Sequence, residues 1–176
     1  MTLTSPPSPR IKISVQTEDF DVAAEMAALR ENNAQVGALA LFVGTVRDLT
    51  HADHAHASPA QKTENHAVSS MTLEHYPGMT ERALQKIVDT AFSRFSIQGA
   101  TVIHRVGVLK PTDQIVLIAV SSAHRADAFD ACRLIIDFLK TEAPFWKKEE
   151  TPQGSRWVEA RASDDTARKR WESRES

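Results

Sequence analysis

The sequence predicts a single α+β domain with a mainly antiparallel sheet and flanking helices. The chain has 176 residues, enough for one domain with a substantial core and too few for two comfortable ones. Apolar residues make up 41% and charged residues 25%, which is the composition of an ordinary globular protein. Strand-like and helix-like patterns are mixed without a strict strand-helix-strand rhythm, which favours α+β over a doubly wound fold.

The first ten residues are rich in proline and small polar residues. Residues 1–10, rich in proline, serine and threonine, are expected to be disordered, and residues 11–172 to form the domain, followed by a tail at 173–176. "IKISV" alternates like a strand, "EDFDVAAEMAALRE" has helical spacing, and "GALALFVGTV" is typical of a buried strand. Gly44 in that strand indicates a bulge or a close backbone approach.

Residues 48–68, "DLTHADHAHASPAQKTENHAV", have neither helical nor strand periodicity. We expect a mobile insertion. Its histidines resemble a metal-binding set, but a metal site needs fixed geometry and supporting hydrogen bonds, which a mobile segment does not supply. The sequence therefore predicts no metal site.

The second half continues the mixed pattern. "SMTLEHY" is strand-like, and "TERALQKIVDTAFSRF" is an amphipathic helix for which Thr80 is the expected N-cap. "GATVIHRVGVL" and "DQIVLIAVSS" are expected to be two strands joined by the turn "KPTD". "SSAHRADAFDACRLIIDFLKTEAPFWKKE" contains the last long helix, and an irregular or short-stranded segment is expected after Pro144.

Charge and apolar content exclude several classes of function. The formal net charge is -2, so the chain is not built to coat nucleic acid or an anionic membrane. The longest apolar run, "IVLIAV", is far shorter than the roughly 20 residues that span a bilayer. The polar start lacks the apolar segment of a secretory signal, so we expect a cytoplasmic protein. The single cysteine, Cys132, lies in an apolar helical pattern and is expected to be structural.

Charged residues at strand and helix ends are the candidate functional residues. His124 and Arg125 follow a strand at an expected helix N-terminus, where backbone N–H groups favour an anion, and arginine suits phosphate or carboxylate. The alternative is that Ser122 caps the helix while both side chains face water. Arg47 ends the strand "LFVGTVR".

Lys140 continues an apolar row at the other end of the same helix. Partial desolvation would lower its pKa and make it usable as a base or nucleophile, although a lysine there can equally reach into water. For Lys147 the same two alternatives are open: a partly desolvated amine that acts in the reaction, or a side chain that reaches into water. Phe145 and Trp146 are expected to anchor this segment on the core.

Five ordered motifs together resemble one family. "FVGTVRD", "LEHYPGMTERAL", "VIHRVGVLKPTD", "VSSAHRADAFDACRLIIDFLKTEAPFWKKE" and "RWVEAR" are similar, in order, to the family of large, catalytic subunits of molybdopterin synthase (MoaE), from about Gly37 to Trp171. The resemblance implies an α/β hammerhead fold. It also implies a homodimer with one small ubiquitin-like subunit of the MoaD type at each end, a heterotetramer.

The same resemblance implies the reaction and its residues. The small subunit carries a C-terminal thiocarboxylate, and its sulfur is transferred to cyclic pyranopterin monophosphate to form the dithiolene of molybdopterin, without a further cofactor. Lys140 and Lys147 are the implied catalytic residues. The implied substrate-binding residues are Thr45, Val46, Arg47, His124, Arg125, Lys148, Glu149 and Arg161.

Two points remain open on the sequence alone. A non-catalytic module that binds a nucleotide or phosphorylated metabolite would explain the arginines and His124, although it gives no reason for Lys140 and Lys147. The insertion after Arg47 is longer and richer in histidine than the family pattern.

A second pair, His104 and Arg105, lies within a strand whose alternation sends the two side chains to opposite faces, so we interpret it as structural or interfacial.

Overall fold

The computed structural model describes residues 8–47, 70–151, 154–158 and 170–171. Residues 1–7 of the expected lead, the histidine-rich insertion, Arg161 and the C-terminal tail lie outside the described residues. The elements are, in chain order, β1 (Arg10–Gln16), α1 (Val22–Arg30), β2 (Ala38–Thr45), β3 (Ser70–His75), α2 (Met79–Arg94), β4 (Ile97–Arg105), β5 (Gly107–Leu109), β6 (Gln114–Ser122), α3 (Arg125–Glu142), β7 (Phe145–Thr151) and β8 (Gly154–Val158).

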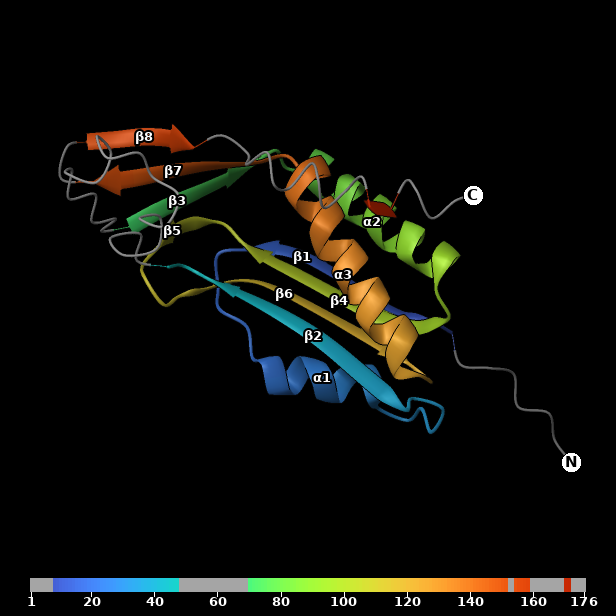
Figure 1. Ribbon diagram of the computed structural model, residues 1–176. Coiled ribbons are helices and arrows are strands. Elements are labelled where there is room, and N and C mark those ends of the chain that lie inside the picture. The colour runs from blue at the N-terminus through green and yellow to red at the C-terminus, as the bar shows by residue number, and fades with distance from the viewer. Residues whose placement is uncertain (1–7, 48–69, 152–153, 159–169, 172–176) are drawn as a thin grey trace, which may run out of the picture.

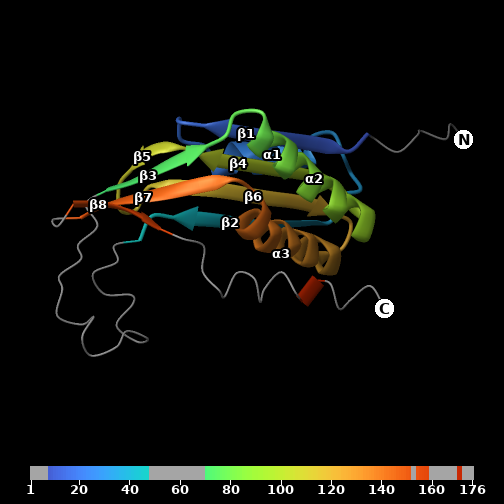
Figure 2. The same cartoon turned by 90° about the horizontal axis from the view of Figure 1, so that it is seen from above.

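The larger sheet has four strands in the order β1-β4-β6-β2 (Figure 1). β1 pairs with β4 in parallel, whereas β4 with β6 and β6 with β2 are antiparallel. α1 lies on one face of this sheet and α2 and α3 on the other, as both views show (Figures 1 and 2). The predicted α+β class with a mainly antiparallel sheet is therefore confirmed.

Both faces of the two central strands are buried, which explains their nearly continuous apolar sequence. On one face, Ile103 and Leu117 pack with Phe20 and Leu29 from the α1 region. On the other, alternate residues of β4 and β6 pack against α2 and α3 in the main core, among them Val102, Ile118, Leu84, Ile87, Leu134 and Ile135.

The smaller sheet is wholly antiparallel, in the order β5-β3-β7-β8. The stretch expected to be one strand up to Leu109 is in fact two, because the chain turns at Gly107, with φ of 86°, and passes from the larger sheet to the smaller one. A positive φ is readily available only to glycine. After Pro144, where an irregular or short-stranded segment is expected, the chain forms two strands, β7 and β8.

The N-cap expected for α2 is wrong. Gly78 is the N-cap, and its backbone N–H donates to the Glu81 carboxylate (N···O 2.6 Å). The turn at Tyr76 starts the helix earlier than the sequence pattern indicates, so Thr80 is the second helical residue and is fully buried. Its hydroxyl is therefore available for contacts inside the molecule.

Candidate active site

The end of β2 places the first group of candidate residues. The pairing of β2 with β6 is shifted between Gly44 and Thr45, which confirms the expected bulge. Beyond it, the backbone N–H of Val46 donates to the carbonyl of Asp113 (2.9 Å), and the Val46 carbonyl accepts from Thr112 (2.8 Å). With its side chain buried and both backbone groups bonded, Val46 fixes the start of the exposed Arg47.

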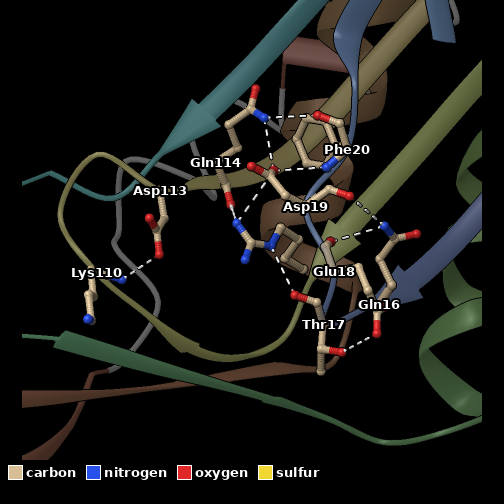
Figure 3. Close-up of polar contacts among 9 residues, drawn as sticks. Gln16, Thr17, Glu18, Asp19, Phe20, Lys110, Asp113 and Gln114 are labelled. Carbon is tan, nitrogen blue, oxygen red and sulfur yellow. Dashed lines mark hydrogen bonds and ion pairs between the residues drawn. The ribbon is translucent and has the colours of Figure 1, made fainter. Parts of the chain in front are cut away.

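A polar network lies behind this bulge (Figure 3). The guanidinium of Arg105 donates to the carbonyls of Thr17 (3.2 Å) and Gln114 (3.0 Å), and the Gln114 amide donates to the Asp19 carboxylate (2.9 Å). Hydrogen bonds from the Phe20 backbone and Gln114, together with the charge of Arg105, lower the pKa of Asp19. Because Gln114 is the β6 partner of Thr45, the network supports the strand end that carries Arg47.

Arg105 thus has a structural role, in agreement with the interpretation from its strand position. The alternation along the strand also predicted correctly that the side chains of His104 and Arg105 point to opposite faces, because His104 is buried on the other face of β4. No sequence pattern predicted that Asp19 would join Arg105 and Gln114, because Asp19 lies far from both along the chain.

The start of α3 places the second group. His124 is the N-cap without a side-chain capping bond, and Arg125 is the first helical residue; both are exposed. The Ser122 hydroxyl accepts from the His124 backbone N–H (3.2 Å) and donates to the Ser96 carbonyl (2.8 Å). Ser122 therefore fixes the approach to the helix, although it is not the N-cap.

An open hollow of about 470 Å³ lies at this helix start, lined by Gly37, Ala38, Ala123, His124, Arg125 and Ala126. A methyl group at Gly37 would lie 2.4 Å from the Ala123 carbonyl oxygen, so only glycine allows this approach. The free N–H groups of the first helical turn and the two basic side chains make the hollow suitable for an anion.

The end of α3 and the start of β7 place the third group. Lys140 is exposed in the last turn of α3, and Lys147 and Lys148 are half-buried on β7. Lys147 pairs with Leu73, whose side chain belongs to the same buried cluster as Val46. Since opposed residues of an antiparallel pair share a face, Lys147 lies on the face turned toward the end of β2.

Lys148 lies on the other face of the smaller sheet. It pairs with Thr72 and Trp157, and its ammonium group is 3.5 Å from the Glu150 carboxylate. Glu149 takes the β7 position opposite Met71, but its side chain is outside the described residues. The structure therefore separates Lys147 from Lys148.

The two ends of α3 are too far apart to serve one small substrate. The helix has 18 residues, which corresponds to about 27 Å at 1.5 Å per residue. β2 begins beside the start of α3, where Gly37 approaches Ala123, and it packs along the helix, so that β2 and α3 end toward the same side. The end of β2, which Arg47 follows, and the last turn of α3, which carries Lys140, therefore lie toward the same side, whereas His124 and Arg125 lie at the opposite end of α3.

Two titratable groups with large pKa shifts, His104 and Cys132, are buried inside the described part of the fold. The His104 ring stacks on Phe145 (centroids 3.8 Å apart), and its Nδ1–H donates to the Arg105 carbonyl (2.8 Å). Burial lowers the pKa of His104 to about 4, so it is neutral at pH 7. Burial raises the pKa of Cys132 to about 12, which keeps it a thiol and supports its structural interpretation.

Within the described part of the chain, no group of three or more histidine, cysteine, aspartate or glutamate side chains is placed to hold a metal ion. The helices of that same part include none that is both long and apolar enough to cross a bilayer.

Comparison with known proteins gives consistent matches. The family model described as "MoaE protein" matches residues 15–142. The chain is 55% identical, over 90% of its length and 83% of the relative's, to a protein from Ralstonia nicotianae named molybdopterin synthase catalytic subunit.

Solved structures agree with these sequence matches. The molybdopterin biosynthesis MoaE protein from Burkholderia ambifaria superposes with a TM-score of 0.74 at 52% identity, covering 92% of this chain and 98% of that one. Molybdopterin synthase from Staphylococcus aureus matches with a TM-score of 0.68 at 30% identity, covering 82% of this chain and 95% of that one.

Proposed function

The chain belongs to the MoaE protein family, and from this membership we infer that it is the large, catalytic subunit of a molybdopterin synthase. It is a sulfurtransferase of molybdenum cofactor biosynthesis. The alternative of a non-catalytic binding module gains no support from relatives that are named as catalytic subunits.

The reaction moves sulfur from the thiocarboxylated C-terminus of a small ubiquitin-like subunit to cyclic pyranopterin monophosphate. The thiocarboxylate sulfur forms a bond to a side-chain carbon of the pterin as a carbon–oxygen bond at that carbon breaks and its oxygen leaves, as water or on the phosphate. Water then cleaves the bond between sulfur and the acyl carbon, which leaves sulfur on the pterin as a thiol and returns the small subunit as a carboxylate. Each transfer needs a proton to be moved and a tetrahedral oxyanion to be stabilised. Two transfers complete the dithiolene.

We assign this chemistry to Lys140 and Lys147. The observation that carries the assignment is that α3 and β2 end toward the same side and that Lys147 lies on the β7 face turned toward the end of β2. Lys140 serves as acid, base or charge stabiliser, with Lys147 beside it. Arg47 supplies a charge that does not titrate near neutral pH, as an anionic pterin requires. Thr45 and Val46 hold Arg47 in place.

His124 and Arg125 complete a site only if a second copy of the chain supplies them. They lie at the opposite end of α3 from Lys140, so one pterin cannot touch both groups within a single chain. A two-fold homodimer that brings the helix start of one copy to the helix end of the other would form two equivalent sites. Arg161 is proposed to join the site across the same axis.

The small subunit completes the assembly as a heterotetramer. Its flexible C-terminus must reach Lys140 and Lys147, so its docking surface lies near this end of the molecule. Lys148 faces away from Lys147 and is better suited to a partner chain than to the same pterin. Glu149 stays a predicted substrate-binding residue. We also propose that the protein works in the cytoplasm, which its single buried free thiol suits.

Reconstitution tests the proposed function. Purified protein is mixed with cyclic pyranopterin monophosphate and with the small subunit in either its thiocarboxylate or its plain carboxylate form. Molybdopterin should form only with the thiocarboxylate. Product from the carboxylate form, or none from the thiocarboxylate form, would contradict the assignment.

A further inference from the structure

A joint of two residues, Ala143–Pro144, separates the helix of Lys140 from the strand of Lys147. The direction in which β7 leaves α3 therefore determines where one lysine lies relative to the other. The proline ring fixes φ of its own residue, so the remaining backbone freedom at that position is ψ, which also orients the Pro144 carbonyl. A contact that holds this carbonyl holds the joint.

Thr80 makes that contact from a different part of the chain. Its hydroxyl donates to the Pro144 carbonyl oxygen (3.2 Å) and accepts from the backbone N–H of Tyr76 (3.2 Å). The Thr80 side chain is fully buried, so water does not compete for these bonds. One hydroxyl thus ties the turn between β3 and α2 to the joint between α3 and β7.

The neighbouring contacts explain why this position is sensitive. Phe145, the first residue of β7, pairs with His75 of β3, and its ring stacks on the buried His104. These contacts hold Phe145 on one side of the joint, and the main core holds α3 on the other. Loss of the Thr80 hydroxyl would leave the Pro144 carbonyl without this partner, and a rotation at the joint to satisfy the carbonyl would shift the end of α3 relative to the start of β7.

We infer that Thr80 is a positioning residue for sulfur transfer, because its hydroxyl sets the Ala143–Pro144 joint and with it the separation of Lys140 and Lys147. The inference rests on the proposed function, which assigns the chemistry to these lysines. Thr80 touches neither substrate nor lysine in this role. It acts through the backbone that connects them, and reaction rates respond strongly to displacements of about 1 Å.

The test compares three variants in the full complex with the thiocarboxylated small subunit. Thr80→Val keeps the shape and removes the hydroxyl, Thr80→Ser keeps the hydroxyl and removes the methyl group, and Thr101→Val removes a buried hydroxyl from β4. We expect Thr80→Val to lower kcat about 10-fold or more with KM for the pterin within about 2-fold. Thr80→Ser and Thr101→Val should stay within about 3-fold of wild-type kcat.

A second readout does not depend on the reaction. Competitive acetylation followed by mass spectrometry measures the reactivity of Lys147 relative to the exposed Lys86 on α2. Because the local surroundings of an amine set its reactivity, Thr80→Val should change this ratio by about 2-fold or more. Thr80→Ser should preserve it.

The outcomes separate this inference from the proposed function. Absence of product from the wild type contradicts the function, while the labelling ratio still tests the joint. Wild-type kcat in Thr80→Val, equal losses in the valine and serine variants, or an unchanged labelling ratio each overturn the positioning role. If Thr80→Val does not fold, Thr80→Ala replaces it, and wild-type kcat there overturns the role as well.

Discussion

His104 shows how a single buried side chain links stability to pH. Its ring lies against Phe145, with the Nδ1–H bonded to the Arg105 carbonyl and 6% of the residue exposed. Burial lowers its pKa from 6.5 to about 4, because the charged form would lose its hydration there. The unfolded chain therefore binds a proton at a higher pH than the folded chain does.

The first prediction follows from this difference. As pH falls from about 6.5 toward about 4, the unfolded state gains a proton that the folded state excludes, so the free energy of unfolding falls. At 1.36 kcal/mol per pKa unit, the full loss is about 3 kcal/mol. Urea unfolding at pH 7, 6 and 5 should show a steeper decline in the wild type than in His104→Phe. The control His124→Gln, at an exposed position, should follow the wild type; equal slopes for wild type and His104→Phe would contradict the prediction.

The second prediction concerns Lys140. Lys140→Ala should lower turnover by about 10²-fold or more, because a positioned acid or base contributes a factor of that order. Stability should fall by no more than about 1 kcal/mol, the typical value of a cation near a helix C-terminus. Lys140→Arg should also fail, because a guanidinium does not release its proton at working pH.

Steady-state kinetics and melting curves measure both effects. Lys86→Ala, another exposed helical lysine, is the matched control and should keep wild-type turnover. High activity in Lys140→Arg would show that the lysine provides only a fixed charge.

At the scale of elements, most helices and strands could be predicted because their residues have clear periodicity. The burial of β4 and β6 on both faces follows from their apolar runs, and the bulge after Gly44 from the glycine itself. The break at Gly107 could not be predicted, because no residue near it in the sequence indicates that the chain passes there from one sheet to another. The cap of α2 was mispredicted because Thr80 has a cap-forming side chain whose partner, Pro144, lies far along the sequence.

The third prediction tests the contact between β2 and α3. Gly37→Ala would place a methyl group 2.4 Å from the Ala123 carbonyl, so the strand or the helix start must move. Overpacking of this kind typically costs about 1–3 kcal/mol. Thermal unfolding should show this loss, and KM for the pterin should rise, because the displacement reaches His124 and Arg125. Ala34→Ser, exposed in the preceding loop, should change neither; an unchanged KM in Gly37→Ala would exclude the helix start from the site.

At the scale of the whole molecule, the sequence indicated the right kinds of residue but not how they are grouped. Arg47, Lys140 and Lys147 lie toward one side because β2 and α3 end there. His124 and Arg125 lie a helix length away. No pattern within the chain states which residues must meet across an axis between two copies, and Arg161 lies outside the described residues. A single list of site residues therefore describes two separate surfaces of one chain.

The fourth prediction uses mixed dimers to test this grouping. Lys140→Ala and Arg125→Ala homodimers should each be nearly inactive. A dimer with one chain of each kind has one site with both wild-type residues and one with neither if the site crosses the axis. Up to about half of the wild-type activity per dimer should then return, because the two sites act independently. Two different affinity tags select the mixed dimers, and absence of recovery would place both residues in the site of one chain.

The parallel pairing of β1 with β4 also sets the order in which the chain can fold during synthesis. Arg10 pairs with Gly99, so the first strand has no place in the sheet until about 90 further residues have been translated. At an elongation rate on the order of 10 residues per second, that interval is on the order of 10 seconds. During that interval, the backbone of β1 has no partner strand and can pair with other nascent chains. Arg10 and Lys12 lie on this strand, and charged side chains of this kind discourage pairing with strands of other chains, so they matter before the fold is complete as well as after it.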